Sequence, residues 1–342
     1  MLRSLTAFVV ALALCVALSA FEPREPHDFL RAVGGMSPAD LAALERGEPV
    51  ARVLDTERRE VAVVGAVRIK APRARMIARY RDVENLKRMG ISLELGLFGE
   101  TATADDVRPL KFEEYDLSSV RECVPGDCPV RLSDTGMTRF RSSVDWDRED
   151  WGHTVSTIWR DLLAGLVTAY RERGDRSLPE YHNKQEPLRV QEEFRLLYEG
   201  SAYVGRLVPE AFRYARDYPA VRLDGASDIF YWSKEDFGLK PVTSITHLMV
   251  YDPPAPKHAV VAAKRVYATH YFDAGLGLTL AIDDEADGFY MVSLTRARTR
   301  SLMSPFRAVV RGIVRNRSRD AMQALLTTTK ASLERQESAS RK

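Results

Sequence analysis

Two hydrophobic periods alternate along this chain and divide it into three regions. In the segment 61–69 apolar residues recur at every second position, which is typical of a strand. Between about 135 and 225 they recur every three to four positions, as in helices, and the stretch 151–171 is the longest of this kind. From Ile229 the period of two returns. The pattern predicts a strand-rich start, a helical block and a second strand-rich region.

Cap and turn residues set the bounds of the predicted elements. Ser37 and Pro38 favour a helix start, with the helix ending near Arg46, and a second helix follows Pro72 to about Arg88. Short strands with turns are expected over 91–132, and shorter helices over 188–198 and 203–214. Longer strands are expected at 50–54, 61–69, 229–232, 242–251, 260–272, 276–282 and 289–295. A last helix is expected over 304–335, with a polar tail at 337–342.

Consecutive hairpins of this kind form an antiparallel sheet, and a sheet with an apolar face has to cover it. The last helix is the only predicted element long enough to cover a curved sheet. The predicted fold class is therefore α+β: a curved antiparallel sheet that grips a long C-terminal helix, with a helical insertion at about 135–225. We expect one domain over 37–336.

The N-terminus has the order of a secretory signal peptide. Arg3 is followed by an apolar run over 5–18 and by small residues at Ala17, Ser19 and Ala20. Because a span needs roughly 20 apolar residues, a cleaved signal peptide over 1–20 is favoured over a membrane anchor. Residues 21–36 are predicted to be a mobile lead-in. The expected location is periplasmic or secreted.

Cys123 and Cys128 remain after cleavage, and they flank a Pro-Gly turn. Such a turn brings two sulfurs together, and an exported protein meets an oxidising compartment. We therefore predict a small disulfide loop. The alternative is half of a zinc site, which lacks nearby partner ligands. No metal or cofactor is expected.

The overall charge is nearly balanced, with 50 basic and 48 acidic residues, which argues against a nucleic-acid binder. Arginines are concentrated near the C-terminus, however, and some recur every four residues on the last predicted helix. This stripe is either a solvated face or a surface for anionic phospholipid. Its members are Arg307, Arg311, Arg315 and Arg319.

In this order of elements the chain resembles the START-like (SRPBCC, helix-grip) superfamily of lipid-binding and polyketide-cyclase-type proteins. The resemblance is carried by the strand and helix at 60–88, the strands at 243–251, 259–272 and 289–296, and the helix after Pro305. It implies an apolar ligand held between the curved sheet and the last helix. The helical block departs from a minimal domain of this kind.

Two histidines lie on strands expected to be neighbours in one hairpin. A histidine on an apolar strand face is either a core residue or a polar anchor inside a ligand cavity, where a few polar groups orient a ligand's head. Lys234 and Glu235 are interpreted as solvated turn residues. The candidate pocket residues are His247, His270, Tyr267, Tyr271, Trp232 and Met249.

No nucleophile elbow, phosphate loop or zinc-protease motif occurs in the sequence. The leading hypothesis is an exported binding or transfer protein for a hydrophobic ligand, such as a lipid, a fatty acyl chain or a sterol-like molecule. One alternative is a cyclase- or hydrolase-type enzyme that uses His247 or His270 as a general base. Another is an envelope interaction protein whose helical block binds a partner.

Overall fold

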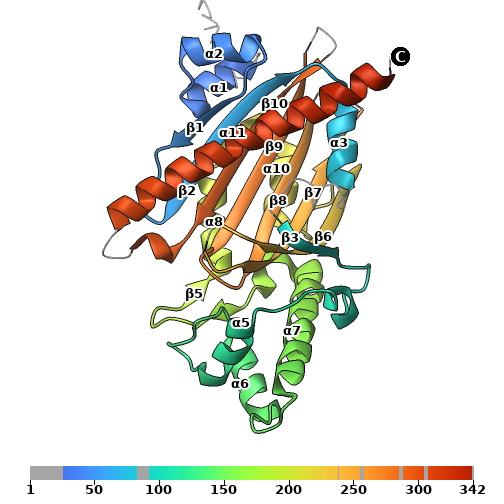
Figure 1. Ribbon diagram of the computed structural model, residues 1–342. Helices are drawn as coiled ribbons and strands as arrows, with labels where there is room; N and C mark the ends of the chain where they lie inside the picture. Colours follow the sequence, from blue (N-terminus) through green and yellow to red (C-terminus); the bar gives the residue numbers. More distant parts are fainter. Residues whose placement is uncertain are drawn as a thin grey trace, which may run out of the picture.

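The computed structural model describes residues 26–82, 92–237, 239–254, 258–284, 288–303 and 307–340 (Figure 1). The predicted signal peptide lies outside these residues, as does the second half of the helix predicted after Pro72. The fold is α+β, as the sequence predicts.

An eight-stranded antiparallel sheet forms the centre of the fold, in the order β1-β2-β10-β9-β8-β7-β6-β3. Every neighbouring pair is antiparallel, including the pairs β2–β10 and β3–β6, whose strands are distant along the chain. Its strands are β1 (Val50–Leu54), β2 (Glu60–Ile69), β3 (Ser92–Leu97), β6 (Ala226–Glu235), β7 (Val242–Tyr251), β8 (His258–Ala268), β9 (Ala274–Asp284) and β10 (Gly288–Arg298). A separate two-stranded ribbon joins β4 (Glu180–Tyr181) to β5 (Leu188–Arg189).

The helices lie on both faces of this sheet (Figure 1). The helical block supplies α6 (Asp134–Ser143), α7 (Trp151–Arg173), α8 (Val190–Glu199), α9 (Ala202–Leu207) and α10 (Pro209–Asp217). The other helices are α1 (Pro26–Gly34), α2 (Pro38–Glu45), α3 (Arg73–Arg81), α5 (Glu114–Ser119) and α11 (Arg307–Ser340). Single 3-10 turns occur at Ala104–Val107, Val120–Glu122, Gly174–Ser177 and Arg300–Met303.

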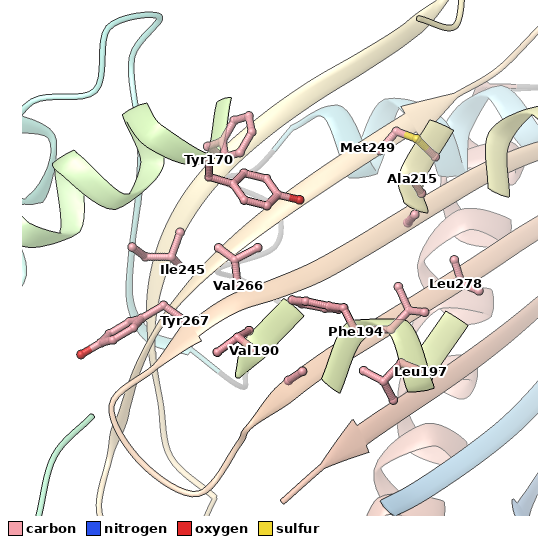
Figure 2. Packing of buried hydrophobic residues seen from close by; sticks show 14 of the residues in the cluster. Tyr170, Val190, Phe194, Leu197, Ala215, Ile245, Met249, Val266, Tyr267 and Leu278 are labelled. Carbon is pink, nitrogen blue, oxygen red and sulfur yellow. The ribbon is translucent and has the colours of Figure 1, made fainter. Parts of the chain in front are cut away.

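Alternate residues of each strand enter two separate cores, because side chains of a strand point to opposite faces in turn. In β7, Ile245 and Met249 pack against the helical block, whereas Leu248 and Val250 face the side of α11. Figure 2 shows Tyr170 of α7 and Phe194 of α8 lying over the first of these faces. A sheet covered on both faces explains why β7 is buried along its whole length.

The C-terminal helix α11 crosses one face of the sheet over β1 and β2 (Figure 1). The contact is close at Gly65 of β2, where an added Cβ would lie 2.7 Å from Met322 Cγ and 2.8 Å from Leu326 Cδ1. Both of these α11 side chains are buried. Where α11 crosses β2, the two elements therefore pack directly and leave no room for a ligand.

Three local predictions need correction. The segment 21–36, predicted as a mobile lead-in, forms α1 from Pro26 on, and Leu30 is fully buried. The region 91–132 contains one strand of the sheet, β3, and is otherwise built of short helices and turns. The polar tail predicted from 337 continues α11 to Ser340.

Lys234 and Glu235, interpreted from the sequence as solvated turn residues, lie buried at the end of β6. Lys234 contacts the carboxylates of Glu94 and Glu113, and Glu235 binds Arg265 at 2.6 Å. Their charges are satisfied by partners that a local sequence pattern does not show.

Among the described helices, none combines the length and the apolar composition that a bilayer span requires.

Candidate functional site

The turn between β8 and β9 places several polar groups beside a cavity. A hollow of about 190 Å³ opens there, which we call the basic pocket. Its lining comes from four separate stretches of the chain: the segment after the cysteine loop, the β4–β5 connection, the β8–β9 turn and the segment after β10. The lining residues are Pro129, Arg131, Asn183, Lys184, Leu188, Thr269, His270, Tyr271, Asp273, Arg300 and Ser301.

Arg131 anchors the pocket to the β8–β9 turn. Its guanidinium binds the Asp273 carboxylate at 3.0 Å and donates to the carbonyls of Ala268 and Phe272. Both charged side chains of this pair are nearly inaccessible, at 7% and 2% exposed. Burial lowers the pKa of Arg131, and the neighbouring Asp273 opposes that shift. The guanidinium stays charged and rigidly held.

His270 lines the same pocket and forms a buried pair with Asp116. Its Nε2 lies 2.8 Å from Asp116 Oδ1, and both side chains are less than a tenth exposed. An ionised carboxylate can only accept hydrogen bonds, so the Nε2 atom of His270 has to be the donor. In the neutral ring the proton is then on Nε2, and Nδ1 keeps its lone pair. Asp116 comes from α5, which therefore fixes the orientation of the imidazole.

The backbone of the turn is itself constrained. Tyr271 has φ of 59°, in the left-handed region that residues other than glycine seldom adopt. Its hydroxyl accepts a hydrogen bond from the Lys240 backbone at 3.3 Å. Such an outlier costs free energy and persists when the surroundings hold it, which marks this turn as a place to look for function.

The basic pocket contains donors that lack acceptors. Arg131 and Arg300 each have a buried Nε–H with no hydrogen-bond partner among the residues that the structure describes. Lys184 is exposed and forms no ion pair within the same described part of the chain. Three cations and one carboxylate, Asp273, line the hollow. A buried donor without an acceptor costs about 1–3 kcal/mol.

The predicted disulfide forms between Cys123 and Cys128, and this is confirmed with the two Cα atoms 4.4 Å apart. The sulfurs are therefore not zinc ligands. Gly126, at φ of 91°, allows the turn between them. The loop holds the β4–β5 connection: Gly126 N donates to His182 O at 2.5 Å, and Cys128 N donates to Asn183 O at 3.3 Å. It thus positions the segment that brings Lys184 to the pocket.

Removal of the disulfide is expected to weaken anion binding more than it destabilises the fold. In the variant Cys123→Ser/Cys128→Ser, the segment at Lys184 has to be ordered on binding, which lowers affinity by roughly 3- to 10-fold. The short ring contributes less than the typical ~2–4 kcal/mol to stability. Calorimetric titration with phosphate, next to urea unfolding, measures both effects. Unchanged affinity would show that the loop does not support the pocket.

The other predicted pocket residues are distributed over the helical-block face of the sheet. Tyr267 lies beneath the basic pocket: its hydroxyl donates to Arg131 O at 3.1 Å and accepts from Trp159 Nε1. Met249 is a core residue, and Trp232 is buried with its Nε1 donating to Asp106 O. The structure therefore brings together His270, Tyr271 and Tyr267, and separates them from Trp232 and Met249.

His247 lies opposite Lys264 in the β7–β8 pair, away from His270, which follows the end of β8. Its Nε2 binds Asp228 at 2.8 Å, its Nδ1 lies 3.4 Å from the Tyr170 hydroxyl, and its ring stacks on Phe230. Burial lowers the pKa of His247, although Asp228 opposes the shift. The ring is a satisfied core group on the helical-block face.

Acidification is expected to destabilise the protein through His247. Because its pKa is lower folded than unfolded, the unfolded chain binds more protons once the pH falls below about 6.5, the ordinary histidine value. The contribution of His247 to the free energy of unfolding is complete above that pH. It is lost as the pH falls toward the pKa that His247 has in the folded protein. Between pH 7.5 and about 5.5, urea unfolding should show a larger loss for wild type than for His247→Gln. Equal slopes would contradict this role.

The C-terminal arginines do not form a free stripe. Arg311 donates to the carbonyls of Thr56 and Glu57 at 2.7 and 3.1 Å, and Arg315 binds Asp55 at 3.3 Å. Arg319 is half-exposed and pairs with Asp320. The side chain of Arg307 lies outside the described part. Two of the four predicted membrane contacts thus fasten α11 to the β1–β2 turn instead.

Most residues of the basic pocket are not predicted as site residues from the sequence. Arg131, Lys184, Arg300 and Asp116 occur in four segments that are distant along the chain, and none belongs to a recognisable motif. The one local signal is the closeness of Arg131 to the predicted cysteine loop.

Comparison of the chain with protein-family models, curated proteins and solved structures gives no match.

Proposed function

We propose that this protein is an exported binding protein for an amphipathic ligand whose anionic head group, a carboxylate or a phosphate, lies in the basic pocket. The observation that carries the proposal is the pair of buried Nε–H groups of Arg131 and Arg300, which have no acceptor among the described residues. Both arginines line the same hollow as Lys184.

The electrostatics of the pocket support an anion. Arginine and lysine form their strongest hydrogen bonds with carboxylates and phosphates, and a partly enclosed site screens these bonds less than open water does. The single lining carboxylate, Asp273, is already bound by Arg131 and by Arg59. Asp273 is therefore not paired with Lys184 in the described part of the chain.

The proposed binding site lies at the β8–β9 turn and not under the last helix, where the family resemblance would place it. A helix-grip protein would hold its ligand under the last helix, but α11 packs directly on β2 at Gly65. We propose the helix-grip relationship for the sheet and α11 only. The recognition of the ligand is proposed for the β8–β9 turn.

Isothermal titration calorimetry at low ionic strength tests this function with inorganic phosphate, acetate and decanoate. We expect saturable binding of at least one probe, weakened in wild type by added salt. Lys184→Gln should lower the affinity about tenfold, while Lys70→Gln, an exposed lysine on another part of the surface, should leave it unchanged. Tighter binding of decanoate than of acetate supports an amphipathic ligand. Absence of saturable binding for all three probes would refute the proposal.

The Asp116–His270 pair favours a second candidate, an acid–base enzyme that uses the same pocket. In this function the free Nδ1 of His270 accepts a proton from the bound anionic substrate or from a water. Hydrolysis of an anionic ester such as 4-nitrophenyl phosphate that falls in both His270→Gln and Asp116→Asn, while phosphate still binds, would support it. Turnover equal to the buffer rate in the wild type would leave binding as the function.

A further inference from the structure

A second hollow lies at the other end of β7 and is separate from the basic pocket. Its volume is about 420 Å³, and it opens between the end of α10 and the start of β6. Ala226, in its wall, pairs with Tyr251 at the end of β7, whereas the basic pocket lies near Thr243 at the start. We call this hollow the tyrosine pocket. Its lining residues are Tyr214, Tyr218, Pro219, Val221, Arg222, Leu223, Asp224, Gly225 and Ala226.

Two tyrosine rings form a corner in this pocket. The rings of Tyr214 and Tyr218 meet at 80°, with their centroids 5.9 Å apart. The ring of Tyr218 is backed by His247, whose centroid lies 4.4 Å away. Burial raises the pKa of Tyr218 to about 12, so its hydroxyl stays protonated and the ring stays neutral at physiological pH. The face of an aromatic ring offers negative potential to a cation.

Carboxylates add to this negative potential. Tyr214 donates its hydroxyl to Asp228 at 2.5 Å, and Asp228 also accepts from the buried, neutral His247. Asp224 lines the rim. The same aromatic cluster already holds cations on its other sides, with Arg171 lying 4.6 Å from the Phe230 ring centre and Lys264 lying 5.6 Å from that of Tyr170. Over Tyr214 and Tyr218, no cation of this kind is found among the residues that the structure describes.

The type of cation follows from the mixed lining. Pro219, Val221 and Leu223 supply apolar walls, which suit a weakly hydrated quaternary ammonium better than a primary amine with its tightly held water. Arg222 is exposed at the rim and has no hydrogen-bond or ion-pair partner among the described residues. It is available for a carboxylate that belongs to the same ligand.

We propose that the tyrosine pocket binds a small zwitterion of the betaine class, with its quaternary ammonium in the Tyr214–Tyr218 corner and its carboxylate at Arg222. The site does not depend on the function proposed for the basic pocket. It takes a different ligand and shares no lining residue with it.

Three probes separate the contributions to binding in a titration followed by calorimetry or by ligand NMR. Glycine betaine carries both charges, tetramethylammonium only the positive one, and 3,3-dimethylbutanoate has the shape of betaine without the positive charge. We expect glycine betaine to bind best, tetramethylammonium next, and 3,3-dimethylbutanoate at least tenfold more weakly than glycine betaine. Equal binding of glycine betaine and 3,3-dimethylbutanoate, or no saturable binding of glycine betaine, would overturn the proposal.

Variants locate the site. Tyr218→Leu should weaken glycine betaine binding about tenfold, and Arg222→Gln should weaken it about threefold while leaving tetramethylammonium unchanged. Tyr115→Leu, at an exposed tyrosine outside the pocket, is the matched control and should change neither. Because Tyr218 also packs in the core, the exposed Arg222 variant decides the case if Tyr218→Leu fails to fold. An Arg222→Gln protein that binds glycine betaine as wild type does would contradict the assigned orientation.

Discussion

Replacing Arg131 by Met is expected to destabilise the protein by about 3–5 kcal/mol, because the substitution leaves a buried carboxylate with half of its partners. Asp273 is 2% exposed and is held between Arg131 and Arg59. The change also removes the donors to the Ala268 and Phe272 carbonyls, which shape the β8–β9 turn.

Urea unfolding of Arg131→Met measures this loss, and Arg148→Met is the matched control. Arg148 pairs with Asp150 on the surface, where both side chains are more than half exposed, so its replacement should leave the midpoint of unfolding unchanged. Similar small effects of the two substitutions would show that the Arg131–Asp273 pair does not organise the turn.

Replacing Gly65 by Val is expected to cost about 1–3 kcal/mol of stability, the usual range for overpacking a filled core. The new side chain would lie within 3 Å of Met322 and Leu326, so α11 has to move away from β2. If α11 and the sheet instead enclosed an open ligand cavity at this point, an added valine would fit into it at little cost.

The matched control is Gly277→Val, which makes the same substitution in another strand of the same sheet. A Cβ at Gly277 would meet its nearest neighbour, Ala263 Cβ, at an ordinary 3.6 Å. Valine has a higher strand propensity than glycine, so the Gly277→Val variant should be as stable as wild type or more stable. Thermal unfolding of both variants compares them, and a loss at Gly277 equal to that at Gly65 would contradict close packing of α11.

The sheet could be predicted from the sequence because its signals are local. Strand β7 has the predicted bounds, since Pro241 and Pro253 delimit a run rich in β-branched and apolar residues. The cysteine loop could be predicted for the same reason, because its turn lies between the two sulfurs. Which face of β7 meets α11 and which meets the helical block could not be predicted, since both faces are apolar.

The basic pocket could be predicted only in part. The sequence predicts His270 and Tyr271 as residues of a cavity under the last helix, whereas the structure places both of them beside the basic pocket. Arg131, Lys184 and Arg300 meet through tertiary packing, which a single sequence does not encode in any local pattern. Charge also misled the interpretation of Lys234 and Glu235, whose burial depends on Glu113 and Arg265 from distant segments.

We propose that an anion binds in the basic pocket beside Arg131 and Arg300. NMR of the arginine Nε–H signals, assigned by the variants Arg131→Lys and Arg300→Lys, observes these two donors directly. We expect both signals to shift saturably, with a common dissociation constant, as phosphate or decanoate is added. Signals that stay in place while the probe binds elsewhere, or while it does not bind at all, would contradict it.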